Sequence, residues 1–319
     1  MKRVILAVMM SIFASLFLSC EKINQENGEQ EKVTIGFSTI LEGVELTSES
    51  FPTRASDVKN LYQVQVSYYP QGSTYSEPYA YGLFDDISLA KFELIKGYTY
   101  SFAIAVYKDG ANQLSRFGAY ESYKYGNKTV FTTISNEPVY DSSNSLEVDF
   151  TSGIVLKGQE AYTIPRIEKF YGSVDSGVIN EATTISVECK RVSFGLRVSV
   201  NNLTKGSVLL ENSSMGDITL TPTNTSFESI YSFYSATLAI KEGYDRGYGY
   251  PTKIYYVRED DMKELLYTLE EYQLRRNQIS VLTINLKSQE PESDKVNGAF
   301  SLSYDAPSFS ESPIVINQE

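Results

Sequence analysis

Apolar residues at every second position are the feature that most constrains how this chain can fold. Residues 61–69 carry Tyr62, Val64, Val66 and Tyr68, with mostly polar residues between them. Side chains of a strand point alternately to its two faces, so this spacing predicts strands with one buried and one solvent-exposed face. The same spacing occurs at residues 33–37, 44–46, 98–106, 192–200, 218–220, 254–256, 282–286, 300–304 and 314–316.

The aromatic composition and the connections favour the same fold class. The chain has 25 Tyr and 16 Phe but no Trp, and Tyr and Phe are enriched on pleated, half-buried surfaces. Connections such as residues 70–82 and 242–252 are rich in Gly, Ser and Pro, which is the chemistry of turns. We therefore predict an all-β fold with one or few short helices.

One segment near residue 265 has helical spacing instead. Met262, Leu265, Leu266, Leu269 and Tyr272 lie at offsets of 0, 3, 4, 7 and 10, with acidic residues just before them. Such an apolar stripe is typical of an amphipathic helix with acids in its first turn. We predict a helix packed on a sheet, with a membrane-lying or partner-binding helix as the alternative.

The length of the chain sets the expected number of domains. A chain of 319 residues is too long for one ordinary core and suits two. A Gly- and Ser-containing stretch around residues 172–182 separates two strand-rich halves. We predict an N-terminal β-rich domain at 33–175 and a C-terminal one at 176–319.

The first residues have the pattern of a secretion signal. Lys2 and Arg3 precede an apolar run at residues 4–18, and the small residue Ser19 comes directly before Cys20. A membrane span needs about 20 apolar residues, and this run stops short of that length. Residues 1–19 are therefore predicted to be a signal peptide rather than a membrane span.

The stretch LFLSC at residues 16–20 resembles the lipobox of bacterial lipoproteins, although Phe17 departs from the usual pattern. That resemblance implies cleavage before Cys20 and acyl chains, such as palmitate, on its thiol and amine. Two or more acyl chains hold a protein on a bilayer without a span. Residues 20–32 would then be a lipidated tether, and ordinary cleavage near Ser19 is the alternative.

Charge and cysteine content restrict the partners and the redox chemistry. The net charge is −12 and no basic patch is present, so no nucleic acid partner is expected. After cleavage and lipidation, Cys189 has no partner for an internal disulfide. It alternates in phase with Ile185 and Val187, which predicts a buried structural thiol.

Catalytic signals are weak throughout the chain. Histidine is absent, which removes Ser-His-Asp and Cys-His arrangements and His-ligated metal sites. Asp85 with Asp86, or Asp260 with Asp261, could form a glycosidase pair, but adjacent acids point apart on a strand and cap a helix in the second case. We expect no enzyme activity, no cofactor and no metal.

Two tyrosine-rich loops are candidates for binding. Tyrosine offers apolar area with a polar tip and suits contact with sugars or with a partner. The candidates are Tyr75, Tyr79 and Tyr81 in one loop, and Tyr244, Tyr248 and Tyr250 in the other. Packing over the ends of a sheet sandwich is the alternative, and a surface glycan-binding lipoprotein of a polysaccharide-uptake system is the function that binding would indicate.

Several short motifs occur in an order that resembles the fimbrillin superfamily of Bacteroidetes, the subunits and accessory proteins of lipoprotein-derived pili. A lipobox-type signal and an N-terminal strand are followed by Thr53, Arg54 and Ala55 in a loop. FYG at residues 170–172 is followed by VECKRVSFGLRVSV, and LRRNQISVLTINL comes later, each with Arg shortly before a strand. The resemblance covers most of residues 1–304.

The resemblance implies tandem transthyretin-like β-sandwich domains and assembly by strand exchange. It implies a lipid on Cys20 that anchors the chain to the outer membrane at the cell surface, in a fimbrium. It also implies proteolytic cleavage between Arg54 and Ala55, which would remove the strand that carries Val33, Ile35 and Phe37. Its partners would be other pilus subunits and a host or bacterial surface ligand, in a stalk, tip or anchor role.

The residues around Arg54 suit cleavage. Pro52 has no backbone N–H and holds Phe51 extended, so residues 47–57 are expected to form an exposed loop with a reachable basic side chain. A strand donated by the next subunit would need apolar residues at alternate positions. Two segments near the C-terminus have them: Phe300, Leu302 and Tyr304, or Ile314 and Ile316.

Overall fold

A computed structural model describes most of the chain after residue 29. The described ranges are 30–42, 58–117, 134–142, 145–146, 148–150, 154–159, 164–241, 251–269, 274–286 and 298–305, with 116, 117, 155 and 298–305 described as backbone only. Residues Val33–Glu319 form one compact unit. No helix among the described residues has both the length and the apolar character needed to cross a bilayer.

Strands dominate the described residues, which confirms the predicted all-β class. The first strands are β1 (Lys32–Leu41), β2 (Leu61–Tyr69), β3 (Glu77–Phe84), β4 (Phe92–Ile95), β5 (Thr99–Tyr107), β6 (Leu114–Phe117), β7 (Val139–Tyr140), β8 (Ile154–Leu156), β9 (Lys169–Val178) and β10 (Thr183–Arg191). The later ones are β11 (Ser193–Asn201), β12 (Ser207–Glu211), β13 (Ile218–Leu220), β14 (Ser226–Ser232), β15 (Thr252–Val257), β16 (Lys263–Leu269), β17 (Ile279–Leu286) and β18 (Gly298–Asp305). The described helices are short: η1 (Ile87–Leu89), α2 (Gly110–Gln113) and α4 (Ala236–Ile240).

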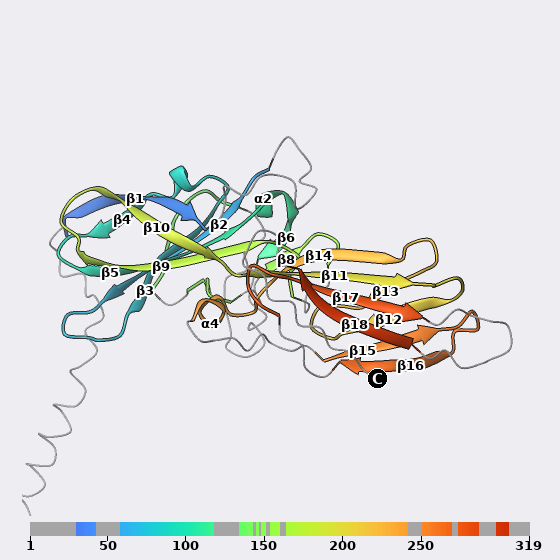
Figure 1. Cartoon of the computed structure of the whole chain (residues 1–319). Coiled ribbons are helices and arrows are strands. Elements are labelled where there is room, and N and C mark those ends of the chain that lie inside the picture. Colours follow the sequence, from blue (N-terminus) through green and yellow to red (C-terminus); the bar gives the residue numbers. More distant parts are fainter. Residues whose placement is uncertain are drawn as a thin grey trace, which may run out of the picture. The chain divides into compact units, whose positions relative to one another are not determined.

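The first strands form a sandwich whose two layers share β10. Strand order is β4-β1-β10-β9-β5-β2-β3-β7. Residues Thr183–Cys189 of β10 pair with β1, whereas Lys190 and Arg191 pair with β9 (Figure 1). This sheet therefore divides into two layers. The narrow layer contains β4, β1 and β10, and the wide layer contains β9, β5, β2, β3 and β7. Side chains from both layers form one apolar core.

The second face of the wide layer is also buried over part of its length, so the predicted solvent-exposed face of residues 61–69 and 98–106 is wrong in part. This second face carries a separate apolar cluster, which includes Leu61, Leu83, Ala105, Tyr107, Leu146, Val148, Ile154 and Leu156. The segment between β7 and β9 supplies the last four of these residues and so covers the face. Gln65 is buried there, and its side chain accepts a hydrogen bond from the Leu146 N–H at 2.7 Å.

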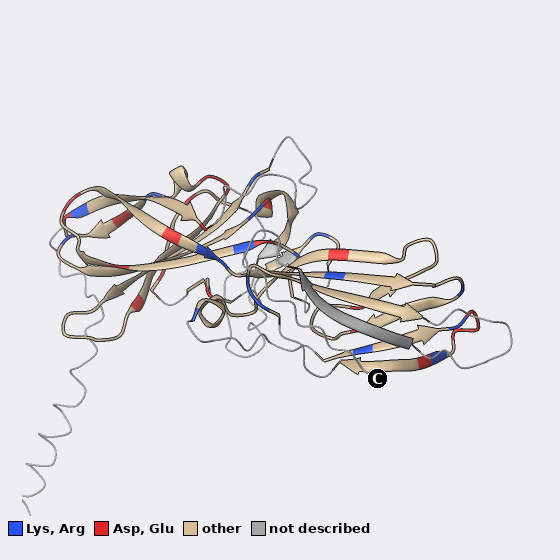
Figure 2. Cartoon of the chain, in the orientation of Figure 1, with Lys and Arg blue, Asp and Glu red and all other residues tan. Residues whose placement is uncertain are grey.

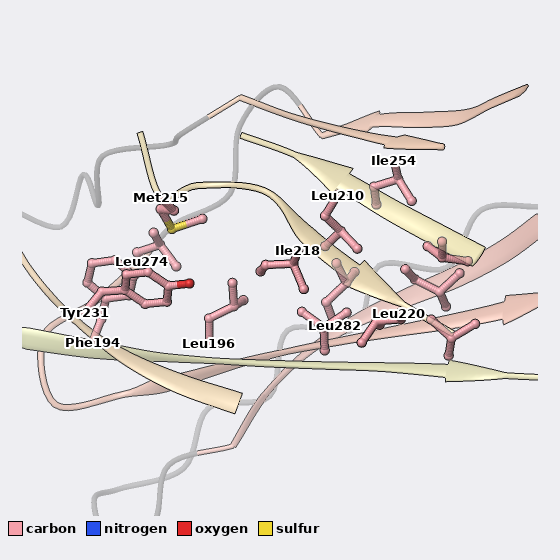
Figure 3. Packing of buried hydrophobic residues seen from close by; sticks show 14 of the residues in the cluster. Phe194, Leu196, Leu210, Met215, Ile218, Leu220, Tyr231, Ile254, Leu274 and Leu282 are labelled. Atoms are coloured by element: carbon pink, nitrogen blue, oxygen red, sulfur yellow. The ribbon is translucent and has the colours of Figure 1, made fainter. Parts of the chain in front are cut away.

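The later strands form a second sandwich of two four-stranded sheets. Their orders are β14-β11-β17-β18 and β13-β12-β15-β16, and β11 and β17 run parallel. Figure 3 shows the side chains that fill the space between the sheets, with the rings of Phe194 and Tyr231 stacked beside Leu274 and Met215. The centroids of those two rings lie 5.5 Å apart.

The predicted helix around residue 265 is wrong, because residues 263–269 form β16 and pair with β15. The register shifts there, since Ile254 pairs with Tyr267 and Tyr255 with Leu265, which leaves Leu266 as an extra residue. A bulge of this kind changes the parity of a strand. Leu266 and Leu269 can therefore both pack on the core, and their spacing of three residues imitates a helix.

The Gly- and Ser-containing stretch at residues 172–182 lies within the β9–β10 hairpin. A boundary between residues 175 and 176 would cut β9, and β9 and β10 both pair with strands of the first sandwich. The chain passes to the second sandwich at Val192, between β10 and β11. The division into two domains stays a prediction. A domain boundary at Val192 would leave every strand and both sandwiches intact.

Candidate functional site around the first strand

Strand β1 contributes directly to the core of the first sandwich. Ile35 and Phe37 are only 0% and 5% exposed, and Val33 and Leu41 pack against the same core. The Phe37 ring meets Phe92 of β4 and Phe102 of β5 edge to face, with centroid distances of 5.7 and 5.3 Å. The residues predicted to face inward therefore do so.

The backbone of β1 is held on both sides. It pairs in parallel with β10, from Ile35 opposite Thr183 to Leu41 opposite Cys189, and β4 lies at its other edge. A strand in the middle of a layer satisfies backbone groups of two neighbours. Removal of β1 would therefore leave unpaired N–H and C=O groups on both β4 and β10.

A charged cluster fixes the C-terminal end of β1. The Glu42 backbone N–H donates to the Cys189 carbonyl at 2.9 Å. Its carboxylate Oε2 accepts from Arg276 Nη1 at 2.7 Å and from the Arg191 backbone N–H at 2.9 Å. Burial alone raises the pKa of Glu42, but the hydrogen bonds from Arg276 and Arg191 outweigh it, so the pKa lies below its usual value.

Further charges lie beside Glu42 in the same cluster. Arg191 Nε contacts Glu168 Oε1 at 2.6 Å, and Lys108 Nζ contacts Glu168 Oε2 at 3.3 Å. Arg276 Nη1 also donates to the Arg191 carbonyl at 3.4 Å. In Figure 2, basic residues lie at the start of β9 and at the end of β10, the two strands that meet here. Three cations therefore face two carboxylates, and one of the two belongs to the segment of β1.

Lys169, at the start of β9, is fully buried close to this cluster. Its Nζ donates to the carbonyls of Val148 and Asp149 at 3.0 and 2.9 Å and lies 5.5 Å from the centre of the Tyr107 ring. Burial lowers the pKa of Lys169 to about 7, although the charge of Asp149 opposes this. No local pattern in the sequence marks Lys169 as buried, so its burial could not be predicted.

Lys169 predicts a pH dependence of stability. Its pKa falls from about 10.5 to about 7 on folding. Between those values the unfolded chain binds more protons, so the free energy of unfolding rises with pH. From pH 6.5 to 8.5 this group is expected to add about 2 kcal/mol. Chemical unfolding of the wild type and Lys169→Met across that range measures the difference between their slopes.

The pH window for this comparison is set by Cys189. Burial raises the pKa of its thiol from 9.0 to about 12, so the unfolded thiol ionises first and stability falls above about pH 9. Below pH 8.5 the Lys169 effect dominates. Equal pH slopes for the wild type and Lys169→Met would contradict an amine that loses its proton on folding.

Several predicted site residues lie outside the described residues and stay predictions: Cys20, Arg54, Ala55, Tyr244, Tyr248, Tyr250, Ile314 and Ile316. Among the described tyrosines, Tyr75 is 81% exposed, whereas Tyr81 is buried. Tyr79 packs edge to face on Tyr100, with ring centroids 5.5 Å apart. These three tyrosines therefore do not form one binding platform, which corrects that hypothesis.

One acid of each adjacent pair, and the thiol, have structural roles. Asp86 Oδ1 accepts from the Ser88 N–H at the start of η1, and Asp260 Oδ1 accepts from the Met262 N–H in the turn before β16. The predicted cap at residues 260 and 261 is thus a turn contact, because no helix follows. Cys189 is buried, as predicted. The described residues contain no group of three or more His, Cys, Asp or Glu that could hold a metal ion.

Comparison with known proteins yields likenesses among solved structures only. No protein-family model matches the chain, and no curated protein matches it. The solved structures similar to it include the fimbrial anchor protein Mfa2 from Porphyromonas gingivalis, with 10% identity, a TM-score of 0.44 and coverage of 90% of this chain and 99% of that one. A fimbrial assembly protein from Parabacteroides distasonis has 10% identity, a TM-score of 0.38 and coverage of 86% and 95%.

A third similar structure is the tip fimbrial protein Mfa3 from Porphyromonas gingivalis. It has 9% identity, a TM-score of 0.30 and coverage of 85% of this chain and 99% of that one. At such identities and TM-scores a likeness assigns no role to particular residues of this chain.

Proposed function

We propose that this chain is a fimbrillin-like surface lipoprotein, a structural or adhesive subunit of a pilus that assembles by β-strand donation. A lipid on Cys20 would anchor its precursor to the outer membrane. The observation that carries the proposal is the position of β1, which is buried and paired on both sides. Residues 42–60, which include Arg54, join this strand to β2.

Cleavage between Arg54 and Ala55 would leave β1 bound by non-covalent contacts alone. If the ten-residue strand departs, it vacates a groove about 33 Å long. The groove would have unpaired backbone groups on β4 and β10 and an apolar space beside Phe92 and Phe102. An extended segment of another subunit with apolar residues at alternate positions satisfies both requirements.

Two donor segments remain under this proposal. Strand β18 pairs along its whole length with β17, from Gly298 opposite Leu286 to Asp305 opposite Ile279. Donation by β18 would therefore require it to leave its own sheet. The other segment, with Ile314 and Ile316, lies outside the described residues.

Digestion with an arginine-specific protease tests the proposal. The soluble precursor without its lipid is expected to be cut after Arg54 and then to form a ladder of oligomers on an unheated detergent gel. An Arg54→Gln variant is the matched control and should stay monomeric under the same digestion. Cleavage after Arg54 without oligomers, or an equal ladder from Arg54→Gln, would contradict strand donation after cleavage at this loop.

A further inference from the structure

The Glu42 site has the geometry of a carboxylate-binding site at one end of the β1 groove. A guanidinium N–H from Arg276 and a backbone N–H from Arg191 converge on a single carboxylate oxygen, at 2.7 and 2.9 Å. The two donors come from the segment before β17 and from the end of β10, so both would stay when β1 leaves. Departure of β1 would remove the acceptor alone.

The charges around the site favour a second acid in the place of Glu42. Glu168 is already paired with Arg191 and Lys108, so it cannot also neutralise Arg276. The side chains of Glu42 and Arg276 are 38% and 29% exposed, which means that solvent screens this pair in part. Such a site selects one strand and its register more than it adds affinity.

The spacing between Phe37 and Glu42 defines the sequence pattern that the site would recognise. Glu42 comes five residues after Phe37, within the segment FSTILE at residues 37–42. The segment FSLSYD at residues 300–305 has the same Phe-Ser start and also ends in an acid, Asp305, five residues after Phe300. Its apolar residues lie at alternate positions counted from Phe300, as those of β1 do from Phe37. A single register therefore aligns the apolar residues and also places Asp305 at the position of Glu42.

We propose that the Arg276–Arg191 site is a specificity-determining carboxylate subsite, and that it receives Asp305 of β18 from a second copy of this chain, with Phe300 in the place of Phe37. The inference rests on the proposed strand donation. It adds the identity of the donor strand, its register and the residues that bind its acid. Aspartate is one methylene shorter than glutamate, and the long Arg276 side chain spans that difference.

Displacement of β1 from the cleaved chain tests this subsite. The chain is cut after Arg54 with its leading segment still bound and fluorescently labelled, and synthetic peptides of residues 298–307 are added in excess. The wild-type peptide is expected to displace the label about tenfold more effectively than the Asp305→Asn peptide. A peptide with Ser303 and Asp305 exchanged keeps the charge and composition, and it should act like the Asp305→Asn peptide.

The protein variant Arg276→Gln completes the test. In that variant the wild-type and Asp305→Asn peptides are expected to act equally, because the acid has lost its main partner. Displacement by all peptides to the same extent from the wild-type chain would overturn the subsite and leave strand donation intact. If no peptide displaces β1, the proposed function fails together with the inference that rests on it.

Discussion

The Phe37→Ala variant of the uncut chain is expected to lose about 3–5 kcal/mol of its free energy of unfolding. The Phe37 side chain is buried, and its ring contacts Phe92 and Phe102 edge to face. Truncation removes apolar burial and leaves a cavity between two layers whose backbones are fixed by their ladders. Denaturant unfolding followed by far-ultraviolet circular dichroism measures the loss.

Ile40→Ala is the matched control for Phe37→Ala. Ile40 lies on the same strand, but its side chain is 59% exposed. Its truncation is expected to change the free energy of unfolding by about 0.5 kcal/mol or less. Similar losses for Phe37→Ala and Ile40→Ala would show that the inward face of β1 does not contribute to the core as described.

The Gly172→Ala variant is expected to cost about 3 kcal/mol, because β9 and β10 come too close at this position for any side chain. A Cβ on Gly172 would overlap the Glu188 carbonyl oxygen and would lie 2.9 Å from a methyl carbon of Val187. The neighbouring atoms are mainly backbone, so relief requires a shift of β10 itself. Because β10 pairs with β1, that shift should also loosen β1. The midpoint and slope of denaturant unfolding measure the effect.

Gly177 provides the control for this change on the same strand. No atom lies within 4 Å of a Cβ built on Gly177. Gly177→Ala is therefore expected to leave the free energy of unfolding within about 0.5 kcal/mol, or to raise it slightly by restricting the unfolded chain. A neutral Gly172→Ala variant would contradict the close approach of β9 and β10.

Alternation of apolar residues predicted strands such as β1, β2, β5, β11 and β17, because a period of two is local information, but it did not predict β3, β9, β12 or β14. Strands at residues 61–69, 99–107, 193–201 and 279–286 follow from it directly. Burial on the second face of β2 and β5 could not be predicted, because a distant segment supplies the cover. The helix predicted around residue 265 was wrong for a related reason: pairing with β15 and a bulge at Leu266 outweighed local spacing.

The candidate site was likewise predicted from the sequence only in part. The sequence predicted that the segment with Val33, Ile35 and Phe37 is a strand with these residues on one face. It did not predict the pairing with β10 or the contact between Glu42 and Arg276, which are 234 positions apart. No short-range pattern specifies such a pair, because only the fold brings the end of β1 to the segment before β17.

Hydrogen exchange of the β10 amides between Thr183 and Cys189 is the most direct test of the central claim that the place of β1 can be vacated and refilled. Slow exchange is expected in the intact chain for those of these amides that donate to β1. After cleavage at Arg54 and release of the leading segment, exchange should become fast in monomers and slow again in oligomers. Slow exchange in cleaved monomers that lack β1, or fast exchange in the oligomers, would contradict this claim.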